Sequence, residues 1–156
     1  MAKEIERKFL VISSAYQSLS KPIYFHQGYM STDPARSVRV RIEGDTAKIT
    51  IKGKTKGFTR DEFEYTIPAD EAQYMLQHLC LQPTIEKYRY KIQIDDLLWE
   101  VDEFVGVNEG LIMAEVELAT EDSPFTKPHW IGTEVTGDTA YYNMSLVNNP
   151  FKNWNK

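Results

Sequence analysis

Hydrophobic and charged residues alternate along most of the chain. In residues 3–11, Glu4, Glu6 and Lys8 fall on one side of an extended segment, while Ile5, Phe9 and Val11 fall on the other. A period of two is typical of a β-strand whose two faces have different surroundings. The same alternation predicts seven further strands, near residues 23–30, 38–43, 47–51, 60–67, 86–94, 98–105 and 113–119. Turn-forming residues separate these segments, so the pattern predicts an antiparallel β architecture.

Helical periodicity predicts three helices among the strands. A short helix is predicted from Ser13 to Leu19, and the clearest one spans residues 69–80, with apolar residues on one side. A third is predicted after Asp138, running until Pro150 stops it. An apolar helical face needs a sheet to cover, so we expect the helices to pack on the hydrophobic faces of the strands.

The other face of the predicted strands collects charged residues, many of them as same-sign pairs two positions apart. Its members are Glu4, Glu6 and Lys8; Arg39 and Arg41; Lys48, Thr50 and Lys52; Glu62 and Glu64; Lys87 and Arg89; Glu100 and Asp102; and Glu115 and Glu117. Such pairs lie about 7 Å apart and repel one another. A solvated surface explains any single strand, but the repeated same-sign pairs favour a face that binds cations and a polyanion.

The length and composition of the chain limit the number of domains and the kinds of partner that such a face could bind. The chain has 156 residues, 42% of them hydrophobic, which predicts one domain over residues 1–156. Its net charge of −5 argues against a general nucleic-acid or acidic-membrane surface. No apolar stretch approaches the roughly 18 residues of a membrane helix, and no signal peptide is evident, so we expect a cytoplasmic location. The single cysteine, Cys80, lies among leucines and is predicted to be a buried structural thiol.

Closing the sheet would turn the charged face into a lumen. A barrel of about eight strands has a bore that holds side chains and a small ligand. Carboxylate oxygens suit Mg²⁺ or Mn²⁺, and Arg and Lys side chains suit phosphate oxygens. The implied ligand is a linear polyphosphate together with a divalent metal.

Several motifs in order along the chain resemble those of the CYTH, or triphosphate tunnel metalloenzyme, family. The opening Glu-x-Glu-x-Lys stands here as Glu4, Glu6 and Lys8. Further matches are QGY at 27–29, RVRI at 39–42, KITIK at 48–52, EFE at 62–64, KYRY at 87–90, EVD at 100–102, EVE at 115–117 and GTEVTGD at 132–138. One departure is Ala140, where family members often carry a basic residue before the aromatic at Tyr141.

The resemblance implies a β-dominated α+β fold: a closed, eight-stranded antiparallel barrel with a few helices, which binds a triphosphate with Mg²⁺ or Mn²⁺. We expect Glu4, Glu6, Glu115 and Glu117 to hold metal, and Lys8, Arg39, Arg41, Lys52, Lys87 and Arg89 to bind phosphate. Glu62, Glu64, Glu100 and Asp102 are expected to support the basic residues. In some relatives a Tyr and Lys pair is proposed to act as the general base, and the resemblance implies Tyr29 and Lys52 for that pair. The alternative is that Tyr29 only packs against its neighbours and Lys52 only binds phosphate.

Hydrolysis of inorganic triphosphate is the leading functional hypothesis, because 156 residues leave little room for a second recognition pocket. The alternatives are a class IV-type adenylyl cyclase, a thiamine triphosphatase and a non-catalytic polyphosphate- or nucleotide-binding protein. The intact acidic set argues against the last. The quaternary structure is left open by the sequence. Phe151 and Trp154 could form a homodimer contact or pack on their own barrel.

Overall fold

The computed structural model describes residues 5–54, 56, 60–120 and 122–154. Within them, nine strands form one antiparallel sheet in the order β5-β4-β3-β2-β6-β7-β8-β1-β9. The strands are β1 (Ile5–Val11), β2 (Ile23–Ser31), β3 (Arg36–Glu43), β4 (Thr46–Gly53), β5 (Glu62–Ile67), β6 (Ile85–Ile94), β7 (Leu97–Phe104), β8 (Ile112–Leu118) and β9 (Ile131–Glu134). The eight strands predicted from alternation are therefore present, and a ninth was not predicted.

The helices are few and short. They are α1 (Ala69–His78) and α2 (Asn143–Asn148), with 3₁₀ turns η1 (Ala15–Ser18), η2 (Gly106–Asn108), η3 (Thr139–Tyr141) and η4 (Phe151–Asn153). The three predicted helices thus correspond to η1, to α1, and to η3 with α2. Within the described residues, no helix has the length and apolar character that crossing a membrane requires.

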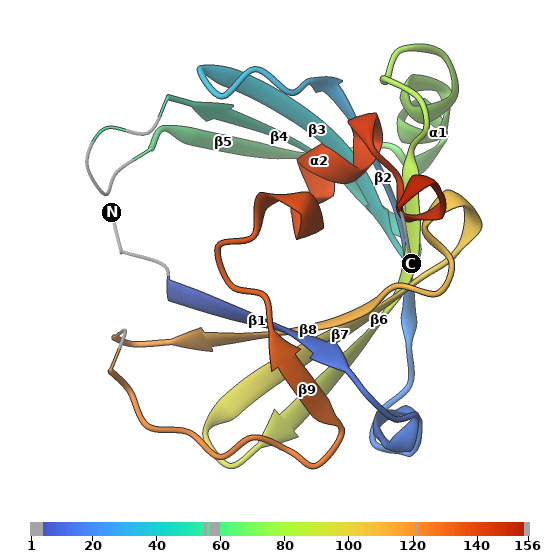
Figure 1. Cartoon of the computed structure of the whole chain (residues 1–156). Helices are drawn as coiled ribbons and strands as arrows, with labels where there is room; N and C mark the ends of the chain where they lie inside the picture. The colour runs from blue at the N-terminus through green and yellow to red at the C-terminus, as the bar shows by residue number, and fades with distance from the viewer. Residues whose placement is uncertain (1–4, 55, 57–59, 121, 155–156) are drawn as a thin grey trace.

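The sheet curls strongly, with β5 at one end of the curl and β1 and β9 at the other (Figure 1). Among the described residues, no strand pairing joins β5 to β1 or β9. The fold is therefore a β-dominated α+β fold with a single antiparallel sheet, and the closed eight-stranded barrel expected from the sequence is not confirmed.

Strand register places the predicted charged residues on one side of the sheet. Directly opposed residues in an antiparallel pair share a face. Glu6 lies opposite Glu117, and Lys8 lies opposite Glu115. The same relation links Arg89 to Asp102, Arg39 to Thr50, Thr50 to Glu64 and Lys52 to Glu62. We call this side, against which α2 lies in Figure 1, the inner face.

Helix α1 covers the outer face of β3 and β4, as the sequence predicts. Its Ala72 and Leu76 pack with Val40, Ile42 and Ala47 in one buried cluster. Gly28 on β2 permits this approach, because a Cβ there would lie 3.0 Å from Cys80 Cβ and 3.1 Å from Leu76 Cδ2. Cys80 is buried, and burial raises its pKa to about 11, in agreement with the predicted structural thiol.

The outer face of the other half is covered by aromatic residues from loops. Tyr16 of η1 and Trp130 pack with Phe9, Trp99 and neighbouring aliphatic residues in a second cluster. Tyr16 meets Tyr90 edge-on at 5.1 Å between ring centroids, and Trp99 meets Trp130 at 6.0 Å. This cluster covers β1, β6, β7 and β8 on their outer face.

Helix α2 lies against the inner face, whereas the sequence pattern favoured the outer, hydrophobic faces of the strands as partners for the helices. Leu146 and Val147 pack with Ile85, Phe104 and Met113 in a third buried cluster. The inner face becomes apolar at this end of the strands, and this gives the helix a hydrophobic surface to cover. The tail aromatics join the same cluster, with Trp154 5.1 Å from Tyr141 and 5.0 Å from Phe151. These contacts within the chain account for the tail; a homodimer is not shown.

Strand β9 extends the sheet beyond β1. It pairs with β1 at Phe9–Glu134 and Val11–Ile131. Glu134 accepts two hydrogen bonds from Arg7, at 2.8 and 2.6 Å, which lock the two strands together. Beyond β9, residues 135–142 cross toward the inner face and lead into α2 (Figure 1).

Candidate functional site

The central strands of the inner face hold a buried network of opposite charges. Asp102 accepts hydrogen bonds from Arg89 Nε at 2.7 Å and Nη2 at 2.9 Å, and it lies 2.9 Å from Lys87 Nζ. Arg89 Nη1 also donates to Glu100 at 3.3 Å. Burial would raise the pKa of Asp102, but Lys87 and Arg89 hold it far below its usual range. Two predicted supporting carboxylates, Glu100 and Asp102, therefore contact a predicted phosphate-binding arginine.

Lys87 is fully buried on this network. Its ammonium donates to Asn143 Oδ1 at 3.2 Å and lies 5.3 Å from the centre of the Phe104 ring. Burial lowers the pKa of Lys87 to about 8, although Asp102 opposes this shift. The bond to Asn143 attaches the first turn of α2 to the floor of the inner face.

Arg41 is fixed by neutral and charged neighbours. Its Nε donates to Gln27 Oε1 at 3.1 Å, and its Nη1 donates to Glu43 at 3.1 Å. The ring of Phe25 lies under both Arg41 and Arg89, at 5.2 and 4.8 Å from the guanidinium carbons. Burial lowers the pKa of Arg41, and the positive charges of Arg39 and Arg89 lower it further. A single aromatic ring thus supports two neighbouring cations.

Acidic residues gather on the inner face of β7, β8 and β1. Glu6 is opposite Glu117, and Glu100 is opposite Glu115, so like charges face each other on adjacent strands. Burial would raise the pKa of Glu115, but hydrogen bonding with Glu6 and the charge of Lys8 lower it overall. Within the described residues, no three His, Cys, Asp or Glu side chains form a group able to hold a metal by themselves. Glu4, also predicted as a metal ligand, lies outside those residues.

A cavity of about 380 Å³ connects the acidic and basic parts of the inner face. We call it the large cavity. It brings together predicted residues from three strands, Glu6 and Lys8 of β1, Tyr29 of β2 and Lys52 of β4. The segment before and within α2 supplies another wall, including Tyr142, whose ring lies 4.8 Å from Lys8 Nζ. Lys8 Nζ also lies 3.8 Å from Glu115.

A second cavity of about 80 Å³ adjoins the first, since both are lined by Tyr29, Lys52 and Arg60. We call it the small cavity. Its remaining polar lining comes from Ser37, Arg39 and Thr50. Burial raises the pKa of Tyr29, while the positive charges of Arg39, Arg41 and Arg60 oppose the shift. The predicted pair of Tyr29 and Lys52 therefore lines the same two cavities.

The remaining predicted supporting residues lie on the edge strand β5. Glu64 accepts a hydrogen bond from Thr50 Oγ1 at 3.0 Å and lies 3.7 Å from Lys48 Nζ. Glu62 is opposite Lys52 in the strand register and is exposed. Both carboxylates thus border the basic strand β4.

Among the polar residues of the site that were missed in the sequence, Gln27, Arg60 and Asn143 each had a different signal. Gln27 has the parity of Tyr29 in the QGY motif and is fully buried beside Arg41. Arg60 has the parity of Glu62 and Glu64, although β5 begins two residues later. Asn143 belongs to a helix, so strand parity gave it no signal.

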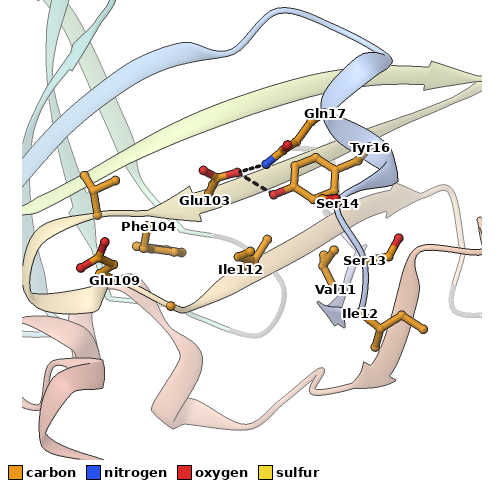
Figure 2. Close-up of a pocket in the computed structure, with 12 residues that line it drawn as sticks. Val11, Ile12, Ser13, Ser14, Tyr16, Gln17, Glu103, Phe104, Glu109 and Ile112 are labelled. Atoms are coloured by element: carbon orange, nitrogen blue, oxygen red, sulfur yellow. Dashed lines mark hydrogen bonds between the residues drawn. The ribbon is translucent and has the colours of Figure 1, made fainter.

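A different hollow of about 420 Å³ lies beside η1, at the ends of β1 and β7 (Figure 2). Its lining includes Glu103, which accepts hydrogen bonds from Tyr16 Oη at 2.6 Å and Gln17 Nε2 at 3.1 Å, and also Glu109. Glu103 and Ile112 pair on the outer side of the sheet. Among the described residues, the lining holds two carboxylates and no cation, which makes this hollow unsuited to a polyanion.

The fold agrees with the family comparison. Residues 2–145 match the CYTH domain, and the chain belongs to this family. It is 53% identical over 154 residues to a protein of Acetivibrio thermocellus named inorganic triphosphatase, covering 99% of both chains. It is 36% identical to an inorganic triphosphatase of Nitrosomonas europaea, covering 92% of this chain and 96% of the relative. A crystal structure described as an inorganic triphosphatase superposes with a TM-score of 0.75 at 33% identity, covering 94% of this chain and 95% of the other.

Proposed function

We propose that this protein is a divalent-metal-dependent triphosphatase that hydrolyses inorganic triphosphate to orthophosphate and pyrophosphate. The observation that supports it most is the large cavity, whose lining combines Lys8 and Lys52 with Glu6. Full-length similarity to two proteins named inorganic triphosphatase supports the same substrate. Residues 1–156 would form one domain, in which the curled sheet encloses the triphosphate as a tunnel.

Basic side chains would bind the substrate and stabilise charge that develops at the terminal phosphorus. Lys8, Lys52 and Arg39 line the cavities and would contact phosphate oxygens directly. Arg41, Lys87 and Arg89 would complete the positive field, with Asp102 and Glu100 holding the last two in position. Preorganisation of this kind lowers the cost of arranging the charges during the reaction.

Carboxylates at the acidic end fit Mg²⁺ or Mn²⁺ in their chemistry. Glu6, Glu115 and Glu117 lie on adjacent strands, and opposed carboxylates repel unless a cation or proton lies between them. Mg²⁺ commonly uses one or two carboxylates together with substrate phosphates and water, so a complete protein cage is not required. Glu4 would join this set. When bound, the metal would neutralise phosphate charge and polarise the attacking water.

The proton of the attacking water needs an acceptor. Tyr29 and Lys52 line both cavities and are the candidates for general base within this proposal. Because burial raises the pKa of Tyr29, its hydroxyl is protonated near neutral pH. Tyr29 would then orient the water or a phosphate oxygen by a hydrogen bond, and Lys52, acting as a neutral amine, would take the proton from the water and become an ammonium.

The test is phosphate release from inorganic triphosphate, thiamine triphosphate and ATP, each with Mg²⁺, with Mn²⁺ and with a chelator, with products identified. We expect orthophosphate from inorganic triphosphate, only with metal, and at least about 100-fold less from Glu117→Gln. Glu71→Gln, which changes an exposed carboxylate on α1, is the matched control and should keep wild-type activity.

Other products would overturn the proposal in distinct ways. Cyclic AMP and pyrophosphate from ATP would identify a cyclase, and preference for thiamine triphosphate would identify a thiamine triphosphatase. Tight binding of triphosphate without turnover under any metal condition would identify a binding protein.

A further inference from the structure

The small cavity is cationic, and within the part of the chain that the structure describes its lining includes no carboxylate. Lys52, Arg39 and Arg60 supply positive charge, while Ser37, Thr50 and Tyr29 supply hydroxyl groups. A volume of about 80 Å³ is several times what one water molecule needs. Gathering positive charge in a partly closed space is unfavourable unless an anion compensates it.

Arg60 is held in place without being neutralised. Its Nε donates to Gly53 O at 2.6 Å, and its Nη2 lies 3.4 Å from both Pro34 O and Ser37 Oγ. These acceptors are neutral and come from the end of β4, the β2–β3 loop and the start of β3. No carboxylate of the described residues lies within ion-pair distance of Arg60, whereas Arg41, Lys87 and Arg89 each have one.

A second observation points to a ligand here. The Nε of Arg39 is buried and has no hydrogen-bond partner among the described residues. Its Nη2 donates to Thr50 Oγ1 at 3.4 Å, which orients the guanidinium along the wall of the small cavity. An unpaired buried donor is unfavourable unless a ligand or water accepts from it. An oxyanion in the small cavity would accept from it and would also compensate Arg60.

We propose that the small cavity binds one terminal phosphoryl group of the substrate, and that Arg60 is the binding residue that makes it selective for a chain end. The substrate itself rests on the function proposed above. A terminal phosphoryl group presents three non-bridging oxygens to donors on several sides, whereas an internal one is linked on two sides. The rest of the triphosphate then extends into the large cavity toward Lys8, because the two cavities share Tyr29, Lys52 and Arg60.

The experiment compares two anions, linear tripolyphosphate and cyclic trimetaphosphate, which has no terminal phosphoryl group. Binding of each to the full chain is measured by calorimetry with a chelator present, so that no turnover occurs. We expect the linear anion to bind wild-type protein more tightly. Arg60→Gln should weaken linear binding about tenfold, since a hydrogen bond to a charged group is lost, and leave cyclic binding unchanged.

Arg36→Gln is the matched control. Arg36 also lies near the β2–β3 loop, but it is exposed, pairs with Asp33 at 2.8 Å and lines neither cavity. It should bind both anions as the wild type does. Equal weakening of both anions by Arg60→Gln would indicate only a general electrostatic effect, and unchanged linear binding would exclude contact; either result overturns the proposal.

Folding and function are separated by two additional measurements. If Arg60→Gln melts at a much lower temperature than wild type, Ser37→Ala replaces it as the test variant, with a severalfold loss expected for the linear anion alone. Unchanged linear binding by that variant would also overturn the site. If wild-type protein binds the linear anion selectively but does not hydrolyse it with metal, the binding site stands and the proposed function is wrong. If wild-type protein hydrolyses the linear anion and Arg60→Gln binds it as wild type does, the proposed function stands and the binding site is wrong.

Discussion

Asp102 pairs with two cations on the inner face. It compensates both Lys87 and Arg89 in a fully buried position, at contact distances of 2.7 to 2.9 Å. Asp102→Asn would keep the shape, leave the buried Lys87 without its carboxylate and leave Arg89 with Glu100 alone. We expect a loss of about 3–5 kcal/mol in the free energy of unfolding, because breaking a buried pair exposes its full desolvation cost.

Urea denaturation at neutral pH measures this change. Asp96→Asn is the control, since Asp96 is exposed in the β6–β7 turn, where Asn is equally suited. A loss under 1 kcal/mol for Asp102→Asn would mean that water or rearranged side chains replace the carboxylate.

Lys87 gives the fold a pH dependence of defined sign. Its pKa is about 8 in the folded protein against an ordinary 10.5, so between these values the unfolded chain binds the extra proton. Stability contributed by this group therefore rises as pH increases from about 8 to 10.5, by up to about 1.4 kcal/mol per pH unit, and is lowest below pH 8. The unfolding free energy of wild type relative to Lys87→Met should thus increase between pH 7.5 and 9.5. A constant difference would mean that the folded pKa of Lys87 lies above this window and that burial does not lower it to about 8.

At the residue scale, alternation along each strand identified most residues of the inner face. It identified neither which residues contact each other across strands nor the residues that lie outside strands. Arg39, Glu115 and the other charged strand residues follow a period of two, which the printed sequence displays directly. The partners of Asp102 depend on the register between β6 and β7, and no property of one strand fixes that register. Arg60 acts from outside a strand, and its importance comes from the two neighbouring segments that hold it.

Gly28 is where packing between elements is tightest. An added Cβ would lie 3.0 Å from Cys80 Cβ and from Thr84 Cγ2, so Gly28→Ala forces α1 and the following loop away from β2. We expect a destabilisation of about 1–2 kcal/mol, measured as a lower thermal midpoint. Gly53→Ala is the matched comparison, because its Cβ would make an ordinary 3.4 Å contact with Asp61. Gly53→Ala should be neutral or slightly stabilising, and equal effects of the two substitutions would contradict this account of Gly28.

Elements were predictable in proportion to their length and periodicity. The ten residues of α1 and the eight long strands show clear periods, and the structure contains them. Strand β9 has only four residues, Ile131–Glu134, too few to display alternation, and its existence depends on β1 and on the Arg7–Glu134 pair. The position of α2 on the inner face depends on tertiary contacts of Leu146 and Val147 that local periodicity does not specify.

At the scale of the whole molecule, the net charge of −5 conceals a separation of charge along the sheet. Strands β3 and β4 contribute Arg39, Arg41, Lys48 and Lys52 to the inner face, whereas β1, β7 and β8 contribute most of its carboxylates. In a flat sheet these groups would be far apart. The curl seen in Figure 1 brings the two ends of the sheet around the same space, so a ligand with both metal and phosphate can contact both at once.

This separation predicts that divalent cations stabilise the protein before any substrate is present. Because Glu6 faces Glu117 and Glu100 faces Glu115, a cation bound there relieves repulsion in the folded state but has no such site in the unfolded chain. At about 100 times its dissociation constant, Mg²⁺ or Mn²⁺ should raise the unfolding free energy by about 2.7 kcal/mol, which amounts to several degrees in thermal midpoint. Sodium chloride at equal ionic strength controls for screening, and Glu71→Gln should respond as wild type does. Glu117→Gln should lose most of the metal response, because it removes one of the facing carboxylates; an undiminished response would place the cation elsewhere on the molecule.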